Sequence, residues 1–219
     1  MATETSTHAY HHGDLSSELM ARAVEHIARS GTEKLSLRAL AREAGVSATA
    51  PFRHFPTKRC LLAAIATRGF RQLRERMLEE MSEEADVEQR FFEMGHAYLG
   101  FAMDNPVPYQ LMFGSVLSDF SDYADLHAAA SDSYAVVDGT LAELIETNAL
   151  DVSVEMLGGA VWSSVHGLAS LQIGRKPPVD SQEEEQMPRP LRALQTVRQD
   201  LDGTMRVLFS GLLKGSKAP

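Results

Sequence analysis

Residues 37–47 read LRALAREAGVS, two short helical segments that meet at a glycine. Ala41 is small enough to let a second helix approach the first, Gly45 permits the positive φ of a tight turn, and Val46 fills the gap between the helices. The residues that would face the core are Leu37, Leu40 and Ala44. The stretch therefore predicts a helix-turn-helix whose second helix spans residues 48–54.

Apolar residues recur at helical spacing along nearly the whole chain, and alternating β-branched runs bounded by Asn-Gly-like turns are missing. The sequence therefore predicts an all-α fold. The first helix is expected to follow Asp14 and to end at Gly31, with Leu15, Leu19, Ala23, Ile27 and Ala28 on one face. The other predicted helices span residues 57–84, 91–103, 108–114, 119–148, 152–174 and 191–213.

Two of these segments have unusual compositions. Residues 156–174 carry no charge, but their glycines, serines and histidine favour a buried helix over a membrane span. In the last helix, apolar residues follow steps of three and four: Leu191, Leu194, Leu201, Met205, Leu208 and Leu212. The pattern leaves open packing within the subunit or a dimer contact. Residues 175–190, with four prolines, are expected to form a surface loop.

The charge is divided unevenly along the 219 residues, whose formal net charge is -9. Residues 1–76 carry +5 and residues 77–219 carry -14, so a basic head precedes an acidic body. The single cysteine, Cys60, excludes a disulfide framework and points to a reducing compartment. The first dozen residues lack the apolar core of a signal peptide, so a cytoplasmic protein is expected.

Three sets of residues carry a family resemblance: Ala44–Ser47, Phe52–Phe55 and Pro56–Lys58. The segment 13–75 resembles the DNA-binding domain of the TetR family of transcriptional regulators. Downstream, residues 162–167 look like the Trp-His-Gly signature of one subgroup of ligand domains, and residues 108–114 are similar to that subgroup as well. The resemblance implies a flexible arm (1–13), a helix-turn-helix DNA-binding domain (14–75) and a larger helical effector-binding and dimerisation domain (76–219).

The same resemblance assigns roles in DNA binding, with Gly45 in the turn. The residues expected to read bases in the major groove are Ala48, Thr49 and Arg53. The residues expected to contact phosphates are Ser36, Arg38, Ser47, His54 and Lys58. For Arg53 a phosphate contact is the open alternative. Two departures stand out: Phe52 replaces the usual tyrosine, and Pro51 lies inside the predicted recognition helix, where it removes one backbone donor.

For the body, the resemblance implies a homodimer through the helices near 152–174 and 191–213, a palindromic operator, and release by a small apolar effector. The expected pocket lining is Phe92, His96, Leu99, Met103, Tyr109, Met112, Trp162 and His166. The first four share one helical face, which leaves Tyr98 pointing elsewhere. Plain core packing is the alternative for each, and His96 and His166 are expected to bind a ligand or each other.

Other functions find little support in the sequence. It contains no glycine-rich phosphate loop, nucleophile elbow or His-Glu-x-x-His motif, so no enzyme and no cofactor are expected. His8, His11 and His12 lack carboxylates or thiols at ligand spacing, so no metal site is expected. The main alternative to a DNA-binding regulator is a helical small-molecule-binding or interaction module without DNA-binding activity.

Overall fold

The computed structural model describes residues 12–117, 121–174 and 185–215. The helices are α1 (His12–Ser30), α2 (Leu37–Glu43), α3 (Lys58–Glu80), α4 (Val87–Asp104), α5 (Pro106–Phe113), α6 (Ala124–Asn148), α7 (Val154–Gln172), α9 (Arg189–Gln199) and α10 (Leu201–Gly215), with 3-10 turns η1 (Ala50–Arg53) and η2 (Ser115–Leu117). These described ranges contain no β-strand, which confirms the predicted all-α fold.

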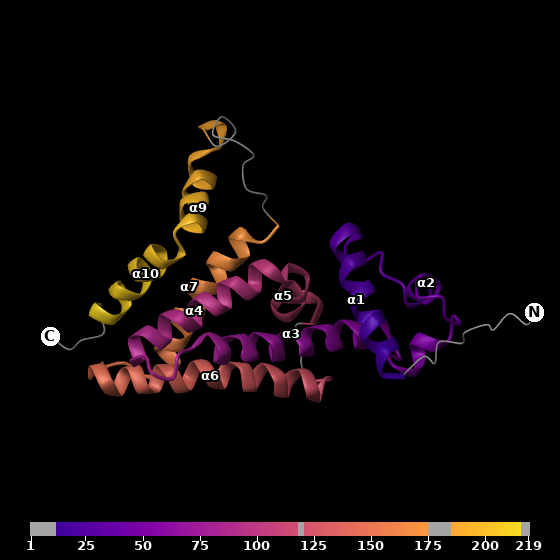
Figure 1. Cartoon of the computed structure of the whole chain (residues 1–219), viewed down its shortest axis with the longest axis horizontal. Helices are drawn as coiled ribbons and strands as arrows, with labels where there is room; N and C mark the ends of the chain where they lie inside the picture. Colours follow the sequence, from indigo (N-terminus) through magenta and orange to yellow (C-terminus); the bar gives the residue numbers. More distant parts are fainter. Residues whose placement is uncertain (1–11, 118–120, 175–184, 216–219) are drawn as a thin grey trace, which may run out of the picture.

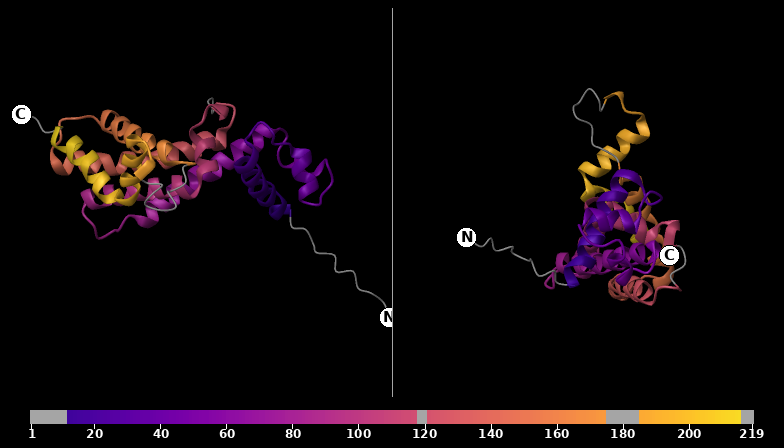
Figure 2. Two further views of the ribbon diagram at one scale, coloured as in Figure 1. Left: turned by 90° about the horizontal axis from the view of Figure 1, so that it is seen from above. Right: turned by 90° about the vertical axis from the view of Figure 1, so that its right-hand side faces the viewer.

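The molecule is elongated, with a small helical head at one end and a larger helical body at the other (Figures 1 and 2). The head consists of α1, α2, η1 and the start of α3. Helix α3 then continues into the body, where it packs against α4, α5 and α6. One uninterrupted helix therefore joins the basic head to the acidic body.

The head is built around the apolar face of α1. Leu15, Leu19, Ala23 and Ile27 are buried as predicted, whereas Ala28 is exposed. The helix ends at Gly31 with a φ of 78°, as expected for a left-handed terminator. It begins at His12, three residues before the predicted start at Leu15.

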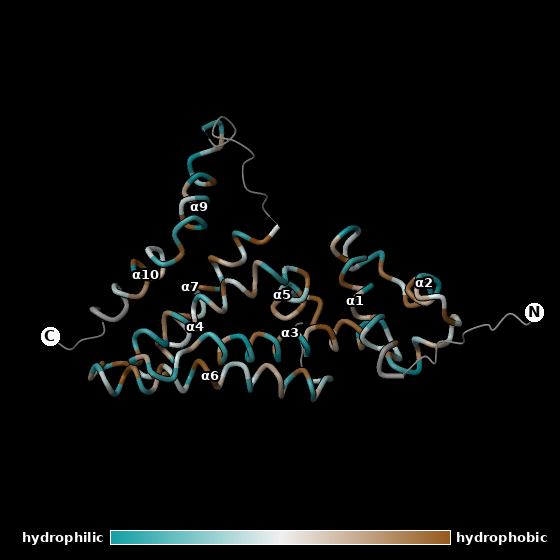
Figure 3. The backbone as a smooth tube through the Cα atoms, viewed as in Figure 1, coloured by the Kyte–Doolittle hydropathy of each residue, from teal (hydrophilic) through white to brown (hydrophobic). Residues whose placement is uncertain are grey.

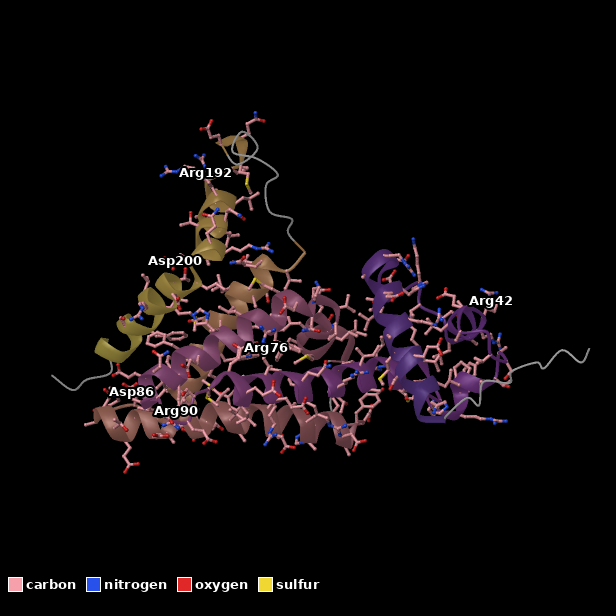
Figure 4. All side chains as sticks on the ribbon, in the orientation of Figure 1. Arg42, Arg76, Asp86, Arg90, Arg192 and Asp200 are labelled. Carbon is pink, nitrogen blue, oxygen red and sulfur yellow. The ribbon has the colours of Figure 1, made fainter. Side chains whose placement is uncertain are left out.

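In the body, polar contacts join the helices around an apolar core. Arg76 of α3 binds Glu80 on its own helix at 2.7 Å and Asp104 of α4 at 2.8 Å. Asp86 caps α4 by accepting a hydrogen bond from the Gln89 backbone, and Arg90 pairs with Glu143 of α6. Arg76, Asp86 and Arg90 are labelled in Figure 4. These contacts fix the start of α4 and tie α4 to α3 and α6.

The predicted single helix over residues 191–213 is wrong, because the chain breaks at Asp200. The Asp200 carboxylate accepts a hydrogen bond from the Gly203 backbone at 2.7 Å and so begins a new helix, α10. Helix α9 buries none of its side chains and is largely hydrophilic (Figure 3). In α10, Met205 and Phe209 are buried against α4.

The uncharged run 156–174, most of which lies in α7, was predicted to be buried, but only one face of α7 is. Leu157, Val161 and Val165 lie in the core, whereas Met156 is 69% exposed and Leu171 50% exposed. The heptad-like pattern of residues 191–213 and the uncharged run 156–174 each indicate an apolar helix face. Neither pattern indicates whether that face packs inside the subunit, against a partner subunit, or against solvent. Most of the predicted surface loop, residues 175–184, and most of the predicted arm, residues 1–11, lie outside the described residues.

Candidate DNA-binding surface and effector cavity

The turn after α2 has the hydrogen bonds of a glycine-terminated helix. The Val46 backbone N–H donates to the Ala41 carbonyl at 3.0 Å, and the Gly45 N–H donates to the Arg42 carbonyl at 3.2 Å. Gly45 has a φ of 68°, in the left-handed region that such a motif requires. Val46 is half-buried against the core. The turn that the sequence predicted is therefore present.

We expect Gly45→Ala to lower the free energy of unfolding by about 1–2 kcal/mol, because a Cβ is disfavoured at this φ. The space around Gly45 is open, so the cost comes from the backbone and not from a clash. Gly139→Ala is the matched control, since Gly139 is helical, exposed and also in open space. The control should be neutral or slightly stabilising in urea unfolding; equal losses in both variants would contradict the assignment.

The second element of the motif differs from the predicted helix over residues 48–54. It is a 3-10 turn over Ala50–Arg53 that follows Thr49, whose side chain makes no capping hydrogen bond. Pro51 has no backbone N–H to donate, and the bonds that form around it are short-range, from Phe52 to Thr49 at 3.2 Å and from His54 to Pro51 at 3.1 Å. Pro51 is itself buried and anchors the turn.

The structure leaves the predicted base readers accessible. Ala48, Thr49 and Arg53 are all exposed, on and just before η1. The Thr49 hydroxyl lies 3.3 Å from the Ser47 hydroxyl, so those two side chains form a pair. These residues lie on one short segment at the end of the molecule farthest from the body (Figure 1).

Three of the predicted phosphate contacts lie together. Ser36, Arg38 and Lys58 line one groove of about 350 Å³, beside Phe52. Lys58 is half-buried, and its Nζ donates to the Glu33 carbonyl at 3.1 Å, which ties α3 to the loop before α2. Of the other two predicted contacts, Ser47 is exposed and His54 is half-buried with its ring 6.3 Å from that of Phe55.

Two residues of this surface were not among the predicted DNA contacts. Phe52, named in the sequence only as a replacement for the usual tyrosine, is 40% exposed in the groove. Arg42, in the last turn of α2, is exposed on the head, where Figure 4 labels it. A local count of basic and aromatic residues around the motif would have found both.

The body contains a large cavity of about 1070 Å³. Its walls come from α3, α4, the α5–η2 segment, α6 and α7. Helix α3 contributes Phe70, Leu73 and Met77, and α7 contributes Trp162. The cavity is mainly apolar and is of the size that drug-like ligands occupy. It is therefore the candidate effector site.

The structure places the eight predicted lining residues in different surroundings. Met112 and Trp162 lie on the cavity wall, and Tyr109 and His166 lie behind it. Phe92 and His96 line a separate pocket near α10, where His96 Nε2 is 2.7 Å from Asp202. Leu99 and Met103 line neither cavity.

Tyr98 corrects the prediction most clearly, because it lies on the cavity wall and was expected to point elsewhere. Helix α4 packs against α3, α5, α6, α7 and α10, so apolar side chains surround it. Spacing along such a helix cannot distinguish the face toward the cavity from the faces in the core. His96 and His166 also bind separate partners rather than each other.

A chain of polar contacts runs behind the cavity. The Tyr98 and Tyr109 hydroxyls are 2.8 Å apart, the Tyr109 hydroxyl is 2.7 Å from His166 Nδ1, and His166 Nε2 is 3.3 Å from Ser170 Oγ. Burial raises the pKa of Tyr98 to about 12 and also raises that of Tyr109, while it lowers the pKa of His166. All three side chains are therefore neutral near pH 7, and the chain links α4, α5 and α7 without a buried charge.

Contacts between head and body run through the α5–η2 segment. A Cβ on Gly69 of α3 would meet Met112 Sδ at 2.6 Å, so α5 lies directly against α3. At the start of α3, Arg59 donates to the Val116 carbonyl at 3.5 Å, and α5 also contacts α1. Met112 lines the cavity, so one segment touches both the cavity and the head.

Two family models match this sequence. The model for bacterial regulatory proteins of the tetR family matches residues 19–65, and that for the tetracyclin repressor-like C-terminal domain matches residues 91–194. The chain belongs to the TetR family. The first match covers the helix-turn-helix and the second covers most of the cavity walls. This TetR family protein is a transcriptional regulator, as the resemblance of residues 13–75 implied.

Solved structures share the fold of this TetR family protein. A protein of unknown function from a Rhodococcus species is 28% identical with a TM-score of 0.68, covering 89% of this chain and 96% of its own. PfmR, a TetR family regulator from Thermus thermophilus, is 20% identical with a TM-score of 0.61, covering 82% and 95%. FadR from Bacillus subtilis, solved with stearoyl-CoA, is 16% identical with a TM-score of 0.62, covering 82% and 93%.

Curated proteins offer no match to this TetR family sequence. Within the described ranges, no helix is both long and apolar enough to cross a membrane. In the same part of the chain, His, Cys, Asp and Glu side chains do not gather in threes as a metal site requires. His8 and His11 lie outside the described residues.

Proposed function

We propose that the protein is a repressor that binds a palindromic operator as a homodimer and is released by a small molecule in the cavity of the body. The continuity of α3 is the observation that carries this proposal. Lys58, at its first turn, lies in the groove of the head, while Phe70, Leu73 and Met77 of the same helix form a wall of the cavity. A ligand that displaces this wall also moves the head.

In this proposal residues 14–75 act as the DNA-binding domain and residues 76–219 as the effector and dimerisation domain, with α3 crossing the boundary. Arg53, Thr49 and Ala48 read bases, and the residues around the groove hold phosphates. The exposure of the base readers and the grouping of Ser36, Arg38 and Lys58 support these roles. Acting on a bacterial chromosome requires that the protein be cytoplasmic.

The dimer contact is proposed to use α7 together with α9 and α10. Gly159 and Gly167 of α7 face open space in the single chain, whereas a Cβ on Gly158 would meet Tyr134 of α6 at 2.7 Å. Two of the three glycines thus leave room for a partner helix, and the exposed Met156 and Leu171 supply apolar surface. Two heads joined through this face would reach half-sites about one DNA turn apart, or a multiple of it.

Residues 162–167, which look like the Trp-His-Gly signature, lie between the cavity and the proposed dimer face of α7. Trp162 lies on the cavity wall, His166 holds Tyr109, and Gly167 faces open space. We propose that this signature joins the cavity to the dimer face of α7. The ring centroids of Trp162 and His166 are 5.3 Å apart, which supports their acting together.

A gel shift with DNA from upstream of the protein's own gene tests the function. We expect one fragment to be retarded at low salt in the presence of excess unrelated duplex, since base contacts add to phosphate contacts at the operator. If no upstream fragment binds at low salt, repression of its own gene is wrong. If no duplex of any sequence binds, the alternative of a helical binding module without DNA-binding activity is correct.

A further inference from the structure

The charges on the cavity wall are strongly biased. Among the described residues, the lining includes one carboxylate, Asp138, and neither lysine nor arginine. His127, which is exposed, is the one basic side chain there. A buried anion without a positive partner is strongly disfavoured. A ligand whose carboxylate or phosphate enters this cavity would find no fixed cation to pair with.

Asp138 lies in a local excess of negative charge. Burial and the nearby Glu155 raise its pKa, and burial together with Asp138 and Glu155 raises that of Tyr134 on the same wall. The ion pairs of the described residues do not include Asp138. A cation beside Asp138 would relieve this excess and would gain a charge-assisted contact.

The rest of the cavity suits the body of an organic cation. Five aromatic rings line the cavity, and the faces of such rings attract positive charge: Phe70, Tyr98, Phe113, Tyr134 and Trp162. The volume of about 1070 Å³ accommodates a ligand with several rings. Charge, aromatic content and size therefore favour the same class of ligand.

We propose that the effector cavity binds lipophilic organic cations, with the positive charge near Asp138 and the apolar body between Tyr98, Phe113 and Trp162. The proposal rests on the proposed function and specifies the class of its effector. The proposal also predicts that this cavity does not bind an acyl-CoA. Such a thioester carries several negative charges, and the described lining offers neither lysine nor arginine to pair with them.

Two ions of nearly the same shape and opposite charge test the proposal. Tetraphenylphosphonium and tetraphenylborate are titrated separately into the full-length protein, and fluorescence is followed from Trp162, which is the only tryptophan in the chain and lies on the cavity wall. We expect tetraphenylphosphonium to bind at least about tenfold more tightly than tetraphenylborate. Equal binding of the two ions, or tighter binding of the anion, would overturn the proposal.

Asp138→Asn should reduce the affinity for tetraphenylphosphonium about tenfold and leave that for tetraphenylborate unchanged or improved. The matched control is Asp132→Asn, because Asp132 is on the same helix but is exposed and is not one of the lining residues. An unchanged preference in Asp138→Asn would refute the role of this carboxylate. Operator binding of the unmodified protein is measured separately. If the protein binds the cation but is not released from DNA, the cation is not the effector. If the protein binds no DNA with or without the cation, the proposed function as a DNA-binding repressor is wrong.

Discussion

Replacing Arg53 with alanine is expected to weaken operator binding at least about 30-fold and to flatten the preference at one base pair of each half-site. A bidentate contact between arginine and guanine contributes about 1–3 kcal/mol of discrimination, and a dimer contains two copies. Arg53 is exposed at the end of η1, so it is accessible to a base edge. The measurement is a set of dissociation constants for operators that vary one base pair at a time.

Lys58→Ala provides the contrast that interprets this result. Removing the Lys58 side chain should weaken binding to all DNA sequences by the same factor. It should also reduce the slope of log K against log salt by about one unit per subunit, as expected for a phosphate contact. Arg74→Ala is the control, because Arg74 is exposed on α3 beside the cavity-wall residue Leu73, about four helical turns from Lys58. If Arg53→Ala also weakened all sequences evenly, Arg53 would be a phosphate contact.

Phe209→Ala is expected to lower the free energy of unfolding by about 3–5 kcal/mol, the usual cost of removing a buried phenylalanine. Phe209 is 1% exposed, and its ring centroid is 4.6 Å from that of Phe91 in α4. This contact docks α10 against the body, so we also expect a weaker dimer. Urea unfolding and sedimentation measure the two effects.

Val207→Ala is the control for Phe209, since Val207 is 78% exposed on the same helix. It should change stability by less than about 0.5 kcal/mol. If Phe209→Ala were as stable as Val207→Ala, the packing of α10 against α4 would be wrong. If Val207→Ala alone weakened the dimer, then the exposed side of α10 would carry the contact between subunits.

The turn after α2 could be predicted closely because it depends on local chemistry. Gly45 adopts the left-handed conformation that the turn requires, and the Val46 N–H donates to the Ala41 carbonyl across it. Such a turn is determined by a few adjacent residues, whatever the rest of the chain does. The change from a basic to an acidic segment near residue 76 could also be predicted from the sequence. It falls within α3, the helix that joins head and body.

The errors arose where packing or a competing local signal decides the structure. Pro51 and Asp200 were visible in the sequence, yet the strength of each as a helix breaker depends on the bonds that form around it. The cavity wall is a different case. Tyr98 lies on it because of how α4 is rotated among the five helices that contact it, and no periodicity along α4 contains that rotation.

The salt dependence of operator binding tests the central claim, that an acidic protein binds DNA through its basic head. Arg38 and Lys58, the charged side chains proposed to contact phosphates, would neutralise about four phosphates in a dimer, so log K should fall linearly with log salt with a slope of about -4. The body does not prevent this, since charges beyond about 8 Å are largely screened at physiological salt. A slope near zero, or no binding at low salt, would contradict the account.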